Sequence, residues 1–91
     1  MSKCDKTITI TNKLGLHARA ATKLAQLSQK FDADVTITLA DKEADASSIM
    51  GLMLLAGAQG KEVTITTKGQ DAERALTDVC QLFDDKFDED E

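Results

Sequence analysis

The sequence predicts an α+β domain in which a four-stranded antiparallel sheet carries three helices on one face. The chain has 91 residues, which suits one domain with a single two-layer core. Four segments alternate apolar and polar residues as half-buried strands do, two others repeat apolar residues at helical spacing, and a third, shorter one is apolar nearly all round; the order is β-α-β-β-α-β-α. Three of the strands repeat threonine on their polar side, and an antiparallel sheet can leave such a face to water.

We expect the strands at residues 6–11, 34–40, 42–46 and 61–68. The segment 42–46 alternates only weakly, so we expect it to be a short edge strand that forms a hairpin with 34–40. The residues expected to face the core are Ile8, Ile10, Val35, Ile37, Leu39, Val63 and Ile65.

We expect helices at 17–29, from 47 or 48 through 56, and at 70–84. The first and last each carry one apolar stripe, whereas the middle helix is apolar nearly all round. The two stripes consist of Ala20, Leu24, Leu27 and Phe31, and of Ala72, Leu76, Val79 and Phe83.

Charge is divided unevenly along a chain whose net charge is −5. Residues 1–30 carry six basic side chains and one acid, whereas residues 31–91 carry five basic and fifteen acidic side chains. An acidic protein without a set of stacking aromatic residues is a poor nucleic-acid binder, so a small anion or an acidic protein surface is the better partner for the basic third. We interpret residues 1–91 as one domain and residues 85–91 as its frayed, solubilising acidic tail.

Cys4 and Cys80 form no CxxC pair, and one histidine cannot supply a zinc motif. We therefore expect two reduced thiols, no metal site and no cofactor. The amino terminus has no long apolar run, which predicts neither a signal peptide nor a membrane span and places the protein in the cytoplasm.

The only histidine, His17, lies in the segment NKLGLHARAATKL (12–24), where a strand ends and a helix begins. The amino end of a helix attracts anions, Gly15 permits a sharp turn before it, and Arg19 adds a forked set of donors. These features are typical of a histidine that accepts a phosphoryl group. A surface histidine that only caps the helix fits the same residues. A metal site or a Ser-His-Asp triad fits less well, because no second ligand or nucleophile is nearby.

The motif LGLHARAA, followed by Ser48 in SSIMGLMLLAGAQGKEVTI, resembles the HPr family over residues 5 to about 87. These proteins are histidine phosphocarriers of bacterial phosphotransferase systems, and the resemblance implies an open-faced β-sandwich. It implies that His17 is phosphorylated on Nδ1 and that Arg19 accompanies the phosphoryl group. Ser48 corresponds to a serine that a kinase phosphorylates in some bacteria, although a helix cap also explains it. Ala20 stands where the family usually has proline, at a cost of roughly 0.4–1 kcal/mol in stability.

The resemblance also implies the partners. The carrier would accept the group from enzyme I, charged by phosphoenolpyruvate, and pass it to an enzyme IIA protein, as a monomeric relay intermediate rather than a complete enzyme. Both partners would use one face, formed by the first and middle helices. If Leu52 and Leu55 face the sheet, other apolar residues of the middle helix must be exposed; the alternative is that all are core. The partner-binding residues expected on this face are Thr22, Lys23, Ile49, Met50 and Met53.

The acidic ending and the run GLMLLA (51–56) resemble the nitrogen-related branch of the family more than the sugar-transport branch. Two functions from other classes stay open. An acyl carrier protein is also small and acidic with a serine at a helix start, but it would need an all-helical chain. A regulatory binding module would keep the fold and use His17 only as a contact residue.

Overall fold

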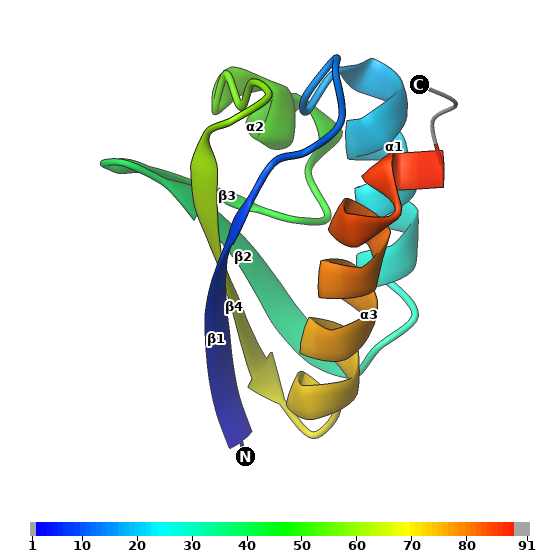
Figure 1. Ribbon diagram of the computed structural model, residues 1–91. Coiled ribbons are helices and arrows are strands. Elements are labelled where there is room, and N and C mark those ends of the chain that lie inside the picture. Colours follow the sequence, from blue (N-terminus) through cyan, green and yellow to red (C-terminus); the bar gives the residue numbers. More distant parts are fainter. Residues whose placement is uncertain (1, 89–91) are drawn as a thin grey trace.

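The computed structural model describes residues 2–88, which form one antiparallel sheet with helices on one face (Figure 1). The sheet has the strand order β1-β4-β2-β3, and every neighbouring pair is antiparallel. The predicted fold class and element order are therefore confirmed. The elements are β1 (Ser2–Thr9), α1 (Ala18–Ser28), β2 (Ala33–Leu39), β3 (Lys42–Asp45), α2 (Ile49–Leu54), β4 (Glu62–Gly69), α3 (Ala72–Asp84) and a short 3₁₀ turn η1 (Lys86–Asp88).

Apolar side chains lie on one face of the sheet and polar side chains lie on the other, as expected. Ile37 pairs with Ile65 on the helix-covered face, and both are fully buried. On the other face Thr7 pairs with Thr64, and their hydroxyls lie 2.9 Å apart. β3 pairs only with β2, at the edge of the sheet, which confirms the predicted hairpin.

β1 begins four residues before the predicted start at Lys6 and ends two residues before Thr11. Its first residue, Ser2, pairs with Gly69 of β4, so ladder hydrogen bonds recruit a segment that has no alternating pattern. Ile10 follows the strand and is nevertheless fully buried, whereas Ile8 is half-buried.

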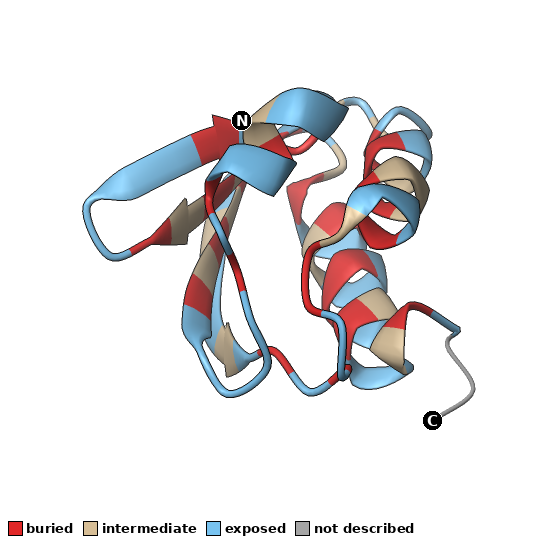
Figure 2. Cartoon of the chain, turned by 90° about the horizontal axis from the view of Figure 1, so that it is seen from above, coloured by how far each residue is buried: buried red, intermediate tan, exposed pale blue. Residues whose placement is uncertain are grey.

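α1 and α3 turn their buried sides toward the sheet and their exposed sides outward (Figure 2). Most stripe residues are buried as predicted, but Leu27, Phe31 and Leu76 are half-buried at the margin of the core. Ala75 and Cys80 of α3 are buried in the core as well. The predicted stripe omitted Ala75 and Cys80 because the buried face of a helix is wider than a single line of four residues.

The expectation of a frayed end is wrong for residues 85–88. Phe87 is fully buried, and its ring packs edge-on against Phe83 with 4.7 Å between centroids. The ammonium of Lys23 in α1 donates to the Phe87 carbonyl at 3.0 Å and lies 3.4 Å from the Asp88 carboxylate. Burial of the Phe87 ring in the core thus holds this turn against the domain, although its neighbours in the sequence are charged. Residues 89–91 of the expected tail lie outside the described residues.

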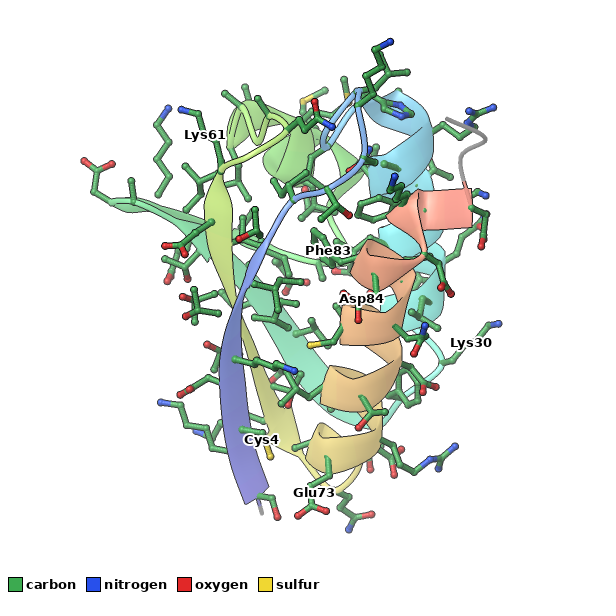
Figure 3. All side chains as sticks on the ribbon, in the orientation of Figure 1. Cys4, Lys30, Lys61, Glu73, Phe83 and Asp84 are labelled. Carbon is green, nitrogen blue, oxygen red and sulfur yellow. The ribbon has the colours of Figure 1, made fainter. Side chains whose placement is uncertain are left out.

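Cys4 on β1 is half-buried and Cys80 is buried, and both are free thiols, as expected. Figure 3 shows Cys4 near the amino end of β1. No helix within residues 2–88 is both long and apolar enough to cross a membrane.

Candidate functional site

His17 is the N-cap of α1, so the helix begins one residue later than predicted. Its backbone is extended (φ −77°, ψ 179°), and its Nδ1 accepts a hydrogen bond from the backbone N–H of Arg19 at 3.2 Å. Helix caps are usually Ser, Thr, Asp or Asn, whose side-chain oxygen makes this bond. Here an imidazole nitrogen takes the place of that oxygen. The cap holds Nδ1 at the amino end of α1, where unpaired N–H groups and the helix dipole favour an anion.

The loop before His17 is held by a turn from Asn12 to Gly15. The Gly15 N–H donates to the Asn12 carbonyl at 3.3 Å, and the side-chain amide of the fully buried Asn12 donates to the Gly15 carbonyl at 2.8 Å. Gly15 has φ +65°, and a Cβ at this position would lie 2.1 Å from the Gly57 carbonyl oxygen. The Leu16 N–H donates to that same oxygen at 2.8 Å. The loop is therefore fixed on both sides of the turn, and only glycine fits at position 15.

The same loop is tied to the carboxyl end of α3. The Thr11 hydroxyl donates to the Phe83 carbonyl at 3.4 Å, and Figure 3 labels Phe83 near that end of the helix. The Gln59 side-chain amide donates to the Thr11 carbonyl at 3.1 Å. His17 thus takes its position from contacts with two other parts of the chain.

The amino end of α1 carries positive charge and no acid. Arg19 lies in its first turn, is exposed, and makes no ion pair with any other residue of the described chain. The first turn contains no Asp or Glu, and Lys13 in the preceding loop is exposed. A doubly negative phosphoryl group on His17 would meet backbone amides and a guanidinium there.

Ser48 is the N-cap of α2, and its hydroxyl accepts from the Gly51 N–H at 3.0 Å. Ser48 therefore caps this helix, as one of its two interpretations predicted. Just before it, the Asp45 carboxylate accepts from the Ser47 hydroxyl at 2.6 Å and from the Ser47 N–H at 2.8 Å. These two bonds hold the pKa of Asp45 below its usual value.

α2 exposes an apolar patch made of Ile49, Met50, Met53 and Leu54, which line a shallow hollow of about 590 Å³. Leu52 and Leu55 are buried, whereas Ile49, Met50 and Met53 are exposed, so the prediction that these three residues cannot all be buried is confirmed and the all-core alternative is wrong. The sequence interpretation missed Leu54, which is 71% exposed. Its exposure could have been predicted, because Leu54 follows Met53 in a helix that has only one side covered by the rest of the protein.

The remaining predicted contact residues, Thr22 and Lys23, are half-buried on α1. The Thr22 hydroxyl donates to the Ala18 carbonyl at 2.7 Å, and Lys23 is bound to the carboxyl-terminal turn. α1 packs directly against α2, and Figure 1 shows the start of α1 and the whole of α2 at one end of the molecule. The structure therefore joins the loop, His17, Arg19 and the apolar patch on one end.

Elsewhere, Lys6, Leu76, Thr77, Cys80, Gln81 and Asp84 line a groove of about 380 Å³ between β1 and α3. Burial raises the pKa of the Cys80 thiol there, so it stays protonated near neutrality. No group of three or more potential metal ligands occurs within residues 2–88.

Comparison with known proteins agrees with this geometry. A family model described as the PTS HPr component phosphorylation site matches residues 4–85. Phosphocarrier protein NPr of Shewanella violacea is 54% identical over 89 residues, which cover 98% of both chains. Phosphocarrier protein HPr of Xylella fastidiosa (strain Temecula1) is 45% identical, over 94% of this chain and 97% of its own. The crystal structure of HPr-C-His from Thermoanaerobacter tengcongensis superposes with a TM-score of 0.91 at 38% identity, over 97% of this chain and 99% of its own.

Proposed function

The chain belongs to the PTS-HPr family, and on this premise we propose that His17 accepts a phosphoryl group from phosphorylated enzyme I and passes it to an enzyme IIA protein. The protein is a phosphocarrier of the phosphotransferase system. We propose that it is an intermediate in a phosphoryl relay and that its part in the relay needs no bound cofactor.

One observation carries the assignment to His17: its Nδ1 is held at the amino end of α1 by the Arg19 amide at 3.2 Å. A nitrogen that accepts a hydrogen bond carries a lone pair, which is what a nucleophile needs. The lone pair attacks phosphorus, the P–N bond of the donor's phosphohistidine breaks, and its electron pair returns to the donor's imidazole. Phospho-His17 then undergoes the same displacement by a side chain of enzyme IIA.

The role of the protein in this reaction is positioning and charge compensation. Once Nδ1 is bonded to phosphorus, it no longer accepts from the Arg19 amide. A phosphoryl oxygen then takes over as acceptor for the first turn of α1, and the Arg19 guanidinium, exposed and without an ion pair in residues 2–88, neutralises part of the added charge.

We assign the chain to the nitrogen-related branch, because the NPr of Shewanella violacea is 54% identical to it whereas the HPr of Xylella fastidiosa is 45% identical. We propose that the end of this relay is regulatory. The apolar patch on α2, beside α1, serves both partners, since each must reach the same histidine. We place the carrier in the cytoplasm as a monomer. Ser48 acts as a helix cap in this proposal, and its phosphorylation is not needed.

The test is phosphorylation of the purified protein by phosphoenolpyruvate, Mg²⁺ and enzyme I, followed by intact mass. Parallel reactions use the nitrogen-type and the sugar-type enzyme I. We expect one acid-labile phosphoryl group, gained faster with the nitrogen-type enzyme and absent in His17→Ala.

No gain with either enzyme would contradict the carrier function and favour a binding module that uses His17 only as a contact. Faster phosphorylation by the sugar-type enzyme would move the protein to the other branch. Circular dichroism of His17→Ala must match the unchanged protein, so that loss of phosphorylation is not loss of fold.

A further inference from the structure

The exposed large hydrophobic side chains of residues 2–88 lie in only two places: on α2, which packs against α1, and in the loop just before His17. Four form the apolar patch on α2, and the fifth is Leu14, which is 65% exposed. Leu14 belongs to neither the apolar patch nor the core; it is the first residue of the motif LGLHARAA, but the sequence assigned it no role.

Leu14 lies at the tip of the turn from Asn12 to Gly15, three residues before His17. Turn tips favour Gly, Asn, Asp and Ser, which satisfy local hydrogen bonds or tolerate the backbone. The turn itself is closed by Asn12 and Gly15, not by its tip. Leucine at the tip therefore has no part in closing the turn, and its exposed fraction shows how little it adds to the core.

Hydrogen bonds hold the turn, and it leads directly into the cap of α1, so we expect a protein that brings a phosphohistidine to His17 to contact this tip. Complete burial of a leucine in an apolar pocket favours association by about tenfold to a hundredfold. A partner that presents polar groups at the same place gains nothing, because those groups would lose their water without finding a bond. One side chain can thus separate two otherwise similar phosphoryl donors.

We propose that Leu14 is a specificity-determining contact residue, which enters an apolar pocket of the cognate phosphoryl donor, the nitrogen-type enzyme I. The inference rests on the proposed function and adds to it a reason for choosing one donor over another. The contact is continuous with the docking face, because Gly15 and Leu16 of the same loop contact Gly57, just beyond α2.

The test compares Leu14→Asn, which keeps similar size but is polar, with Leu14→Met, which keeps the apolar character. Leu54→Asn is the matched control, since Leu54 is exposed to a similar extent (71% against 65%) but belongs to the apolar patch. We expect Leu14→Asn to lower kcat/KM with the nitrogen-type enzyme I at least tenfold, mainly through KM, and to change it less than twofold with the sugar-type enzyme. Leu14→Met should stay within threefold of the original, and Leu54→Asn should affect both donors alike.

Equal losses with both donors, or no loss with either, would overturn the inference. So would a lower thermal midpoint of Leu14→Asn, which would show that the leucine supports the fold. If the unchanged protein is phosphorylated by neither donor, the proposed function fails and this inference with it. If the unchanged protein is phosphorylated, the Leu14 variants decide the inference alone.

Discussion

Gly15 controls the position of His17 through its backbone. Its φ of +65° disfavours any side chain, and a Cβ would lie 2.1 Å from the Gly57 carbonyl oxygen. We expect Gly15→Ala to lower the free energy of unfolding by about 1–3 kcal/mol or more and to slow phosphorylation of His17. Denaturant unfolding and the rate of phosphate gain measure the two effects.

Gly60→Ala is the control for this prediction. Gly60 also has a positive φ, of +90°, but a Cβ there meets nothing within 4 Å. Gly60→Ala therefore introduces backbone strain without the steric clash that Gly15→Ala makes with the Gly57 carbonyl oxygen. Equal stability of the two variants would contradict the importance of the close approach.

We expect Arg19 to contribute to phosphorylation through its charge and to contribute little to the stability of the fold. It is exposed, and its guanidinium has no ion pair within the described chain. Hydrogen bonds to a charged group contribute about 1.5–3 kcal/mol, so we expect Arg19→Ala to reduce kcat/KM for phosphorylation roughly tenfold to a hundredfold with little change in unfolding.

Arg74→Ala is the control variant, because Arg74 is an exposed arginine on α3, where it lies 3.8 Å from the Asp71 carboxylate and 5.7 Å from the centre of the Phe31 ring. It should transfer phosphate at the original rate. If both arginine variants are slowed to the same extent, the effect comes from net charge and not from the site.

At the scale of the element, α2 depends on its cap. Six residues with a glycine in the middle form a weak helix, and the Ser48 hydroxyl binds the Gly51 N–H at 3.0 Å. We expect Ser48→Ala to lower the free energy of unfolding by about 1 kcal/mol and to weaken the use of the apolar patch by partners. Urea unfolding and binding of enzyme I measure these effects.

Ser48→Asp should retain most of the stability, since aspartate also caps helices. If Ser48→Ala unfolds like the original protein, the cap contributes nothing and a regulatory role of the serine becomes the better explanation.

The sequence predicted the elements themselves better than their ends. Alternation located β2, β3 and β4 to within a residue or two, because each has one buried and one wet face. It missed the first residues of β1, which are held only by pairing with β4. His17 and Gly15 were visible because they are a rare residue and a turn residue in a motif. Leu14 was not, since exposure of a turn tip depends on contacts that only the fold creates.

At the scale of the whole molecule, the carboxyl-terminal turn completes the hydrophobic core. Phe87 is fully buried against Phe83, and Lys23 joins the turn to α1. We expect Phe87→Ala to lower the free energy of unfolding by about 3–5 kcal/mol, measured by denaturant titration. Removal of Glu89, Asp90 and Glu91, which keeps Phe87 in place, serves as the control. If the two variants have equal stability, the turn is not part of the folding unit.

The fold as a whole followed from pattern and size, because a chain this short can cover an antiparallel sheet on only one side. The role of residues 85–88 did not, since a run of acids concealed one phenylalanine. Sequence patterning weighs many residues together, and a single buried ring in a polar segment becomes apparent only when the core is assembled.

The cap of α1 also makes the Arg19 amide a spectroscopic reporter. Its proton points at Nδ1 of His17, the atom that we expect to be modified, at a donor–acceptor distance of 3.2 Å. Replacement of an imidazole nitrogen by a phosphoryl oxygen changes the acceptor of that one proton, and its magnetic environment with it. A single backbone resonance should therefore read out, in real time and without a label on phosphorus, what fraction of the carrier is loaded.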